Sequence, residues 1–269
     1  ASGAGSGTKA ELLDLLGVPD NEVLSKQCGN LYRLLYSDNK IGKLNIANSI
    51  WMDDDMNGEP VVFKDDFVKQ AAENYYATSH RVDFAKKETG EAMADWISEH
   101  TNGTLSPTIE TQPEQILSIL NTVYFYDQWI DRFDNSKTDE DVFHLSNGNE
   151  VNCDFMNQNI GSAMFSKGEG FTRAAKGLKD SGQMVFILPD EGVSPYDLLS
   201  SPERMQEAFE GGEGFNGEIV WKVPKFSFGS KLEVTSVLKS LGIRSALTAD
   251  ADFSNSIVVV DNKLGEKCS

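Results

Sequence analysis

Residues 117–125 read Leu-Ser-Ile-Leu-Asn-Thr-Val-Tyr-Phe, and Trp129 and the pair Phe133-Asp134 follow at short intervals. Helix and strand patterns both fit the apolar run 116–125, but its β-branched and aromatic end favours a strand. Asn121 places a polar amide in this run, and by itself it is most simply a polar residue near a strand end. Trp129 by itself is most simply a core aromatic residue. The stretch therefore predicts a strand with a core aromatic side chain soon after it.

Working outward from this strand, the sequence predicts helices early in the chain and more strands late in it. Helical spacing of apolar residues predicts helices over 12–16, 21–36, 66–76, 89–100, 194–211 and 232–241. Alternation and short apolar runs predict strands over 44–52, 80–84, 184–188 and 218–228. This order lacks the strand–helix rhythm of a parallel sheet, so it is typical of an α+β fold. We expect one domain over residues 1–269, since this length is long for one domain and short for two.

Three local details of these elements are also predicted. Ser6 or Thr8 is expected to cap the first helix. The run 184–188 is expected to be a buried strand, because it is wholly apolar and ends at a turn. The helix over 21–36 is expected to carry one apolar face, formed by Leu24, Cys28, Leu31, Leu34 and Leu35.

The charge of the chain limits its partners. With 24 Lys and Arg against 42 Asp and Glu, the net charge is −18. A polyanion repels phosphate backbones and anionic lipid surfaces, so nucleic acid and membranes are poor candidate partners. High solubility is the simplest consequence of this charge, and steering towards a basic protein partner is the more specific alternative.

The cysteines and the apolar runs indicate no disulfide framework, no zinc site and no membrane span. Cys28, Cys153 and Cys268 are odd in number and widely spaced, which fits neither a disulfide framework nor a zinc site. No apolar run approaches the roughly 18 residues that a membrane span requires. Asn102-Gly103-Thr104 matches a glycosylation acceptor, although such triplets often occur by chance.

Sequence motifs of catalysis and of cofactor binding are missing from the chain. It has three histidines and contains no His-x-x-x-His pair, no Gly-x-Ser-x-Gly elbow and no phosphate-binding loop of the P-loop type. Asp53, Asp55, Asn57 and Gly58 match the start of a calcium loop, but the twelfth position holds Lys64 instead of a chelating carboxylate. We therefore predict no catalytic, cofactor-binding or metal-binding residues, no cofactor and no enzyme activity. An unrelated hydrolase is a remote alternative.

The residues around the first strand resemble the serpin family of serine protease inhibitors. In that family an Asn, a Phe four residues on, a Trp eight residues on and a Phe-Asp pair follow one another, as do Asn121, Phe125, Trp129 and Phe133-Asp134 here. Further blocks agree in order over Gly3 to Ser254, and the Leu-Pro-Asp-Glu turn is similar to that of many prokaryotic members. These blocks are 45–51, 96–97, 101–103, 170–174, 184–192, 223–226, 241–243 and 251–254.

The resemblance implies a fold and a function. The implied fold is an α+β serpin-like domain with a large mixed β-sheet and packed helices, whose main sheet opens to accept its own cleaved loop as a new strand. In that fold Asn121 resembles the shutter asparagine at the sheet centre, and Trp129 resembles the breach tryptophan where insertion begins. The implied function is suicide-substrate inhibition of a serine, or alternatively a cysteine, endopeptidase. By analogy the location is extracellular or at the cell surface, with the cytoplasm as the alternative.

The resemblance ends near both termini. Before the position of Gly3 the family has two helices and a strand, and after Ser254 it has another central strand, a Glu-Gly-Thr hinge, a reactive loop and three closing strands. Here 255–269 contain no hinge run and no bait residue, and 257–260 are a candidate for the missing sheet strand. The domain is therefore expected to be truncated at both ends. Three explanations stay open: an incomplete sequence, one fragment of a cleaved or split molecule, or a truncated non-inhibitory scaffold that serves as a binding or carrier module.

Overall fold

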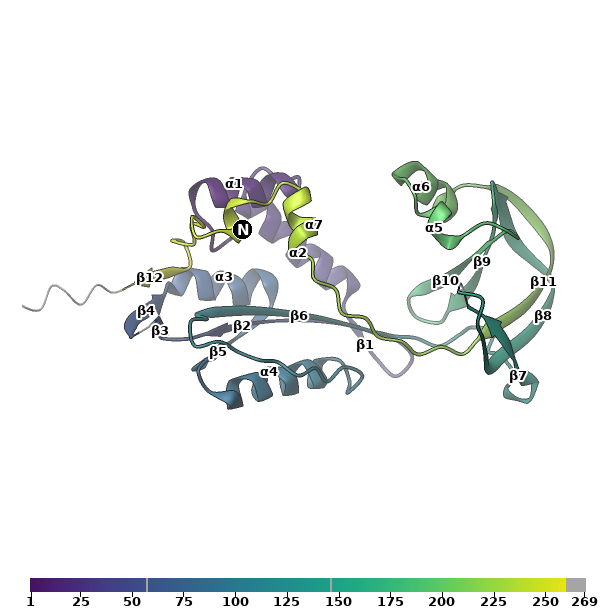
Figure 1. Ribbon diagram of the computed structural model, residues 1–269, viewed down its shortest axis with the longest axis horizontal. Helices are drawn as coiled ribbons and strands as arrows, with labels where there is room; N and C mark the ends of the chain where they lie inside the picture. Colours follow the sequence, from purple (N-terminus) through teal and green to yellow (C-terminus); the bar gives the residue numbers. More distant parts are fainter. Residues whose placement is uncertain (57, 146, 260–269) are drawn as a thin grey trace, which may run out of the picture. The chain divides into compact units, whose positions relative to one another are not determined.

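The computed structural model describes residues 1–56, 58–145 and 147–259, and the chain divides into two compact units (Figure 1). Unit 1 contains Ala1–Tyr126 together with Lys231–Ser269, and unit 2 contains Asp127–Ser230. Each unit is described by itself. The single domain over residues 1–269 stays a prediction.

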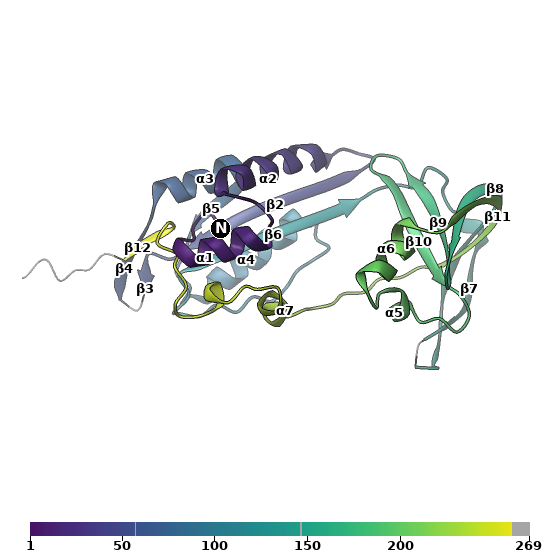
Figure 2. The same cartoon turned by 90° about the horizontal axis from the view of Figure 1, so that it is seen from above.

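Unit 1 is a sheet with helices on both faces. The helix α4 lies on one face of β2, β5 and β6, and α1, α2 and α3 lie on the other (Figure 1 and Figure 2). Its elements are α1 (Ser6–Leu15), α2 (Asn21–Leu35), β1 (Ser37–Asp38), β2 (Lys43–Met52), β3 (Asp55–Met56), β4 (Glu59–Phe63), α3 (Asp65–Tyr75), β5 (Ala77–Arg81), α4 (Lys87–His100), β6 (Leu117–Tyr126), α7 (Thr235–Ser240), the 3-10 turn η2 (Ser245–Leu247) and β12 (Ile257–Val259).

The centre of unit 1 is the antiparallel pair of β2 and β6. Lys43 lies opposite Tyr126 at one end of this pair, and Met52 lies opposite Leu117 at the other. The strand β5 pairs in parallel with the other edge of β2, so the sheet is mixed, as predicted. The expected strand over 80–84 is thus displaced towards the N-terminus, because Ala77–Arg81 is the part that finds a partner in β2.

The two faces of β2 bury different clusters, because successive side chains of a strand point to opposite faces. Ile50 and Met52 pack in one cluster, whose other buried members are Val61, Phe63 and Ala71. Trp51 packs in the other, whose other buried members are Phe84, Met93, Trp96 and Ile97. Full burial of one such side chain stabilises the fold by roughly 1.5–3 kcal/mol. The two clusters therefore fix the sheet between α3 and α4.

The structure corrects two expectations about the first helices. Neither Ser6 nor Thr8 caps α1, since the helix begins after Gly5 with no side-chain cap, and Thr8 Oγ1 instead accepts a hydrogen bond from Asp252 N. The apolar face of α2 is buried only in part: Leu24 is buried, whereas Leu34 is 79% exposed. Leu31 and Leu35 are also exposed, although Cys28 is half-buried. Helical spacing put these residues on one face, but nothing in the described part of the chain covers its second half.

The run 257–260 does not replace a strand of the main sheet. Within it, Ile257–Val259 form β12 and pair antiparallel with Val61–Phe63 of β4, in a separate small sheet. Val260 lies outside the described residues. The apolar composition predicted a strand correctly, but it did not predict that β4 would be the partner strand. The backbone carbonyl of Ser256 accepts a hydrogen bond from Lys64 N at 2.9 Å, and this bond places β12 beside β4.

Unit 2 is an antiparallel sheet with two short helices. Its strand order is β10-β9-β8-β11, and β7 also pairs with β8. Phe133, Trp221 and Val223 form its main buried cluster. The elements are η1 (Asn135–Lys137), β7 (Thr138–His144), β8 (Glu150–Gly168), β9 (Phe171–Leu178), β10 (Gly182–Pro189), α5 (Pro195–Leu198), α6 (Pro202–Glu210) and β11 (Glu213–Pro224).

Two predictions in unit 2 were wrong in detail. The run 184–188 is a strand, but it is not buried, since Leu188 is 70% exposed and β10 pairs with β9 alone among the described strands. The expected helix over 194–211 is two helices, because Pro202 cannot donate a backbone hydrogen bond to a preceding turn. Pro202 instead opens α6, where Ser201 accepts a hydrogen bond from Arg204 N as the cap.

Candidate functional site

The strand pair β2–β6 brings Asn121 opposite a second asparagine. Asn121 and Asn48 are register partners, and Asn121 Nδ2 donates to Asn48 Oδ1 at 2.8 Å. Asn121 Nδ2 also lies 3.4 Å from the backbone oxygen of Ala47. Asn121 is exposed and Asn48 is half-buried. The predicted shutter-like residue is therefore joined to β2 by a side-chain bond in addition to the backbone ladder.

Asn48 extends this contact to the helices on the same face. Its Nδ2 donates to the backbone oxygen of Tyr75, the last residue of α3, at 2.7 Å. The Tyr75 hydroxyl lies 3.2 Å from Ser25 Oγ of α2 and 3.1 Å from Ser2 Oγ. A continuous set of polar contacts thus runs from β6 through β2 to α3 and α2. We call Asn121, Asn48 and Tyr75 the asparagine relay.

Asn48 was not singled out from the sequence. It had the same signal as Asn121, a polar amide within a strand rich in apolar residues, but only the register of the two strands shows that the amides meet. A residue of this kind fixes strand register, since a slip by one residue moves every side chain to the opposite face.

The outer edge of β6 carries no strand partner among the described residues, where β6 pairs with β2 alone. On the face that carries Asn121, Ile119 is 66% exposed, Val123 60% and Phe125 53%. Such an edge presents unpaired backbone donors and acceptors next to apolar side chains, which is a template for an added strand. The geometry around Asn121 therefore combines a polar relay with an open strand edge.

Trp129 lies in unit 2, in an aromatic cluster. Its ring is 6.1 Å from that of Phe133 at an interplanar angle of 87°, and 6.4 Å from that of Phe186. Its backbone forms an isolated bridge with Leu178 of β9. Trp129 is half-buried and packs against the cluster of Phe133, Trp221 and Val223. The expectation that it is a core aromatic residue is confirmed, while its breach-like role stays a prediction.

A lysine ammonium occupies the centre of this aromatic cluster. Lys176 of β9 is 4% exposed, and its Nζ lies 4.5 Å from the ring centre of Phe133, 5.5 Å from that of Trp221 and 6.0 Å from that of Trp129. Nζ donates to Gln158 Oε1 at 2.5 Å and makes no ion pair with any described carboxylate. Three aromatic faces attract the cation and so compensate part of its lost hydration.

Burial lowers the pKa of Lys176, and the charge of Asp131 opposes this shift. The cause is desolvation, since a low-dielectric surrounding disfavours the charged form of an amine. Lys176 was not singled out from the sequence, because the residues that surround it are distant in sequence and an isolated lysine on a strand is ordinarily exposed. We call Lys176 with Trp129, Phe133 and Trp221 the lysine cage.

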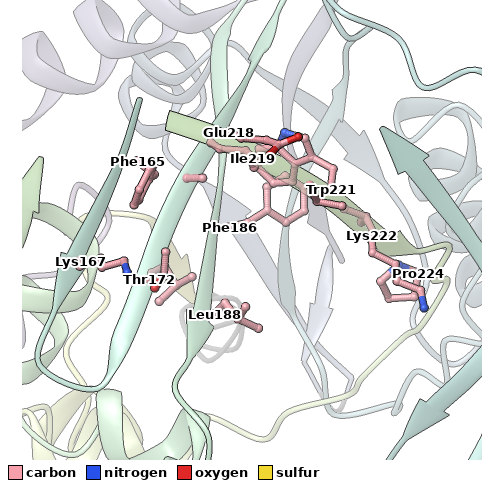
Figure 3. A pocket seen from close by; sticks show the side chains of 14 residues that line it. Phe165, Lys167, Thr172, Phe186, Leu188, Glu218, Ile219, Trp221, Lys222 and Pro224 are labelled. Atoms are coloured by element: carbon pink, nitrogen blue, oxygen red, sulfur yellow. The ribbon is translucent and has the colours of Figure 1, made fainter. Parts of the chain in front are cut away.

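A cavity of about 550 Å³ lies beside this cluster in unit 2 (Figure 3). Phe186 and Trp221 lie next to each other on one side of it, with ring centres 5.2 Å apart, and Phe165, Lys167 and Thr172 lie on another side. Its walls come from β8, β9, β10 and β11. It is large enough for a small ligand, since such sites commonly measure roughly 300–1,000 Å³.

The candidate calcium loop from the sequence has a structural role in its described part. Asp53 is buried, and its carboxylate accepts from Phe84 N at 2.8 Å and from Asp55 N at 3.2 Å, while Asn57 lies outside the described residues. Among the described residues, no group of three or more acidic, histidine or cysteine side chains is arranged to hold a metal ion. Within the same residues, no helix has the length and apolar character needed to cross a membrane.

The cysteines and the candidate glycosylation residue can also be placed. Cys28 and Cys153 are free and half-buried in different units, and Cys268 lies outside the described residues. Asn102 is exposed at the end of α4 in a left-handed conformation, and its side-chain nitrogen lies 3.3 Å from the Tyr124 hydroxyl.

Comparison with known sequences gives one consistent family. Residues 1–265 match the family model described as Serpin (serine protease inhibitor). Serpin-ZX of Arabidopsis thaliana is 27% identical over 96% of this chain and 68% of its own length. Serpin-Z10 of the same plant is 29% identical over 91% of this chain and 65% of its own length. The chain thus spans about two thirds of the length of these relatives.

Comparison with solved structures agrees. A thermophilic serpin, tengpin, in the latent state matches with a TM-score of 0.82 at 25% identity, over 96% of this chain and 69% of that one. Thyroxine-binding globulin in complex with thyroxine matches with a TM-score of 0.81 at 21% identity, over 97% of this chain and 71% of that one, which shows a likeness of fold. The α+β serpin-like fold is confirmed, and the similarity to prokaryotic members stays a prediction.

Proposed function

The chain belongs to the serpin family, whose members are in general protease inhibitors, and we propose that it inhibits a serine endopeptidase as a suicide substrate. The protease would attack a reactive loop that lies outside residues 1–269, and a cysteine endopeptidase is the second target class. The nucleophile would form an acyl-enzyme with the loop, and insertion of the cleaved loop into the sheet would prevent hydrolysis of that ester.

The observation that carries this proposal is the edge of β6 beside Asn121. The inserted strand needs a strand edge that has no strand partner, and among the described residues β6 pairs with β2 alone. The asparagine relay fixes β6 to β2 by side-chain bonds at the middle of this edge. In this proposal Asn121 holds the edge in register for the incoming strand, and Trp129 has the breach-like role at the start of insertion.

The proposal is tested with the complete gene product. It is mixed at equal concentration with trypsin, chymotrypsin, elastase, subtilisin or papain, and the products are separated in SDS. We expect at least one protease to give a band at the summed mass. The same protease without its nucleophile is the matched control and should give none. Cleavage of the protein by every protease without an SDS-stable complex would rule the mechanism out.

A non-inhibitory carrier is the alternative, favoured by the cavity in unit 2. This cavity combines the aromatic rings of Phe186 and Trp221 with two cations, Lys167 and Lys222, and one anion, Glu218, so its lining carries a net positive charge that suits an aromatic anion. Thyroxine-binding globulin, whose fold is similar, is known in complex with thyroxine. Saturable binding of thyroxine together with the absence of any protease complex would favour the carrier over the inhibitor.

The expected cellular location and partners follow from the same proposal. We place the protein outside the cell or at its surface, with the cytoplasm as the alternative, and its net charge of −18 suits either. A protease is the expected partner, and nucleic acid and membranes are not. Detection of the native protein in the cell lysate with none in the medium or at the surface would refute the extracellular placement.

A further inference from the structure

Two histidine rings lie against two tryptophan rings where α4 covers the sheet of unit 1 (Figure 1). His80 of β5 and Trp51 of β2 are register partners, and their rings stack with centres 4.1 Å apart and an interplanar angle of 13°. His100, the last residue of α4, stacks on Trp96 one turn earlier, with ring centres 4.2 Å apart and an angle of 25°. Trp51 and Trp96 belong to one buried cluster. We call these four residues the histidine–tryptophan cluster.

Hydrogen bonds hold both imidazole rings in these positions. His80 Nε2 lies 3.0 Å from Thr78 Oγ1. His100 Nδ1 lies 2.8 Å from the backbone oxygen of Trp96, and because a carbonyl only accepts, Nδ1 is the nitrogen that donates. A hydroxyl both donates and accepts, so each of the two bonds is also compatible with a protonated ring. Protonation therefore adds a charge to either ring without requiring the ring to turn.

The surroundings of His80 oppose a charge on its ring. Burial is the first cause that lowers the pKa of His80, and the charge of His100 is the second. Both rings are half-buried. The contacts of His80 on the sheet, Trp51 and Thr78, are uncharged, so the sheet supplies no counter-ion through them.

The charged side chains of the neighbouring elements do not balance the two rings. Among the described residues, His144 of unit 2 is the one histidine that lies within ion-pair distance of a carboxylate. On α4, Asp95 and Glu99 are exposed. Arg81 of β5 lies on the opposite face of the sheet, where its guanidinium is 5.6 Å from a ring centre of the other cluster. Protonation of both rings thus places two like charges at the contact between α4 and the sheet.

We propose that the histidine–tryptophan cluster makes the packing of α4 on the sheet respond to pH. At neutral pH the stacked rings hold the C-terminal turn of α4 against β2 and β5, and in mild acid like charges loosen this turn. Opening lets the rings reach water, so the open form binds protons more readily than the packed form. The stabilisation from His80, whose pKa is lowered, is fully present above about pH 6.5 and is lost as pH falls towards the pKa of the packed state.

The loosening is confined to the end of the helix. Met93 and Ile97 are buried in the same cluster and keep the rest of α4 on the sheet. The last turn is closed by Thr101 N, which donates to the backbone oxygen of Ile97 at 3.0 Å, and by Gly103 N, which donates to that of Ser98 at 2.8 Å. Exchange of these two amides with solvent reports opening of the turn. This inference does not depend on whether the protein inhibits a protease.

The first test follows the imidazole NMR signals of the complete chain against pH. Because the sequence has three histidines, His80→Gln, His100→Gln and His144→Gln assign them all. We expect His80 to titrate below about pH 6.5, and its pKa to rise in His100→Gln, where the second cause of the lowering is removed. His144→Gln is the matched control and should leave His80 unchanged. A His80 that titrates at or above about pH 6.5 would show that attraction to the Trp51 face outweighs burial, and would overturn the proposal.

The second test measures backbone hydrogen exchange at pH 7.5 and 5.5, corrected for the intrinsic rate. In the wild type we expect the protection of Thr101 and Gly103 to fall about threefold or more at the lower pH, while α6 of unit 2, which has no histidine, keeps its protection. The variant that combines His80→Phe with His100→Phe keeps an aromatic ring on each tryptophan but cannot be protonated there, so its protection should not depend on pH. His144→Phe is the control and should behave as the wild type.

The outcomes of the exchange test are distinct. Equal protection of Thr101 and Gly103 at both pH values in the wild type overturns the proposal, and this readout holds even if the double phenylalanine variant fails to fold. A loss that persists in that variant assigns the response to other groups and overturns it as well. A loss that disappears in the double variant but persists in His144→Phe establishes the cluster as the pH-responsive contact.

Discussion

Asn121 Nδ2 donates a hydrogen bond to Asn48 Oδ1 across the β2–β6 pair at 2.8 Å. The two residues are 73 positions apart in sequence and directly opposite in register. The bond joins the strand with the open edge to the strand at the centre of the sheet. Because Asn48 also donates to the backbone oxygen of Tyr75, one amide connects β6 to the end of α3.

Replacing Asn121 with Ala is expected to lower the free energy of unfolding by about 0.5–1.5 kcal/mol, the usual net value of one hydrogen bond. Urea unfolding measures this loss. The double variant, which also carries Asn48→Ala, should lose less free energy of unfolding than the sum of the losses of the two single variants. The difference should be about 0.5 kcal/mol or more, because both single variants remove the same bond. Ser79→Ala on the exposed side of β5 is the control and should change little. Strict additivity would show that the bond contributes nothing to stability.

Replacing Lys176 with Met is expected to stabilise the protein at pH 7 by about 1 kcal/mol, because a buried cation without a carboxylate partner is exchanged for an apolar chain of similar length. Gln158 loses its partner, but it is only half-buried and can bond to water. Lys137→Met, at an exposed position, is the control and should shift the midpoint little. A destabilised Lys176→Met protein would mean that the aromatic faces compensate the charge fully.

The same residue gives a pH dependence of known sign. The pKa of Lys176 is lowered in the folded state, so between that value and about 10.4 the unfolded chain binds more protons. The free energy of unfolding of the wild type therefore increases, through Lys176, as pH rises through that window. The advantage of Lys176→Met should shrink from pH 7 to pH 10, which urea midpoints at each pH would measure. An advantage that is constant with pH would contradict the lowered pKa.

Asp127 fixes the turn between β9 and β10, and Asp127→Asn is expected to destabilise it. Its carboxylate accepts from Ser181 N at 2.9 Å, Ser181 Oγ at 2.5 Å and Gln128 N at 2.6 Å. Burial by itself raises the pKa of Asp127, but these hydrogen bonds outweigh it and leave the pKa below its ordinary value. We expect the variant to lose about 1–2 kcal/mol at pH 7, since bonds to a charged acceptor are the stronger ones.

The pH dependence of this loss follows from the lowered pKa. The stability from Asp127 is fully present above about pH 4, the ordinary carboxyl value, and is lost as pH falls through the folded pKa. Wild type and Asp127→Asn should therefore converge in unfolding midpoint below about pH 3. Asp139→Asn, at an exposed position, is the control. A difference that persists undiminished at pH 2.5 would assign the effect to geometry instead of charge.

Two glycines in helices make a matched pair with opposite outcomes. A Cβ on Gly90 of α4 would lie 2.2 Å from the backbone oxygen of Ile109, whereas one on Gly7 of α1 meets nothing within 4 Å. Gly90→Ala should lower the free energy of unfolding by about 1–3 kcal/mol through overpacking. Gly7→Ala should raise it by about 0.5–1 kcal/mol, because alanine has less backbone freedom to lose. Thermal unfolding of both variants checks the sign, and equal shifts would contradict the close approach.

Much of the fold was predictable because its signals are local. The helical spacing of apolar residues predicted the helix over 89–100, and the structure buries Met93, Trp96 and Ile97 on one face of α4, since residues three and four apart share a face of a helix. Pro202 begins a second helix where apolar spacing alone had predicted a single one, and this proline signal was present in the sequence. The helix α2 shows the limit, because spacing identifies a stripe but does not determine what covers it.

By itself, the sequence determined most of the helices, the α+β class and the family, because propensity, periodicity and ordered motifs lie within short stretches of chain, but it did not predict the strands β7, β8 and β9. Only the tertiary structure decided which distant residues meet. Asn48 faces Asn121 through strand register, and Lys176 lies among Trp129, Phe133 and Trp221 through the packing of strands far apart in sequence. The physical reason is that hydrogen-bond pairing and burial are properties of two surfaces in contact, and a local pattern specifies one of them.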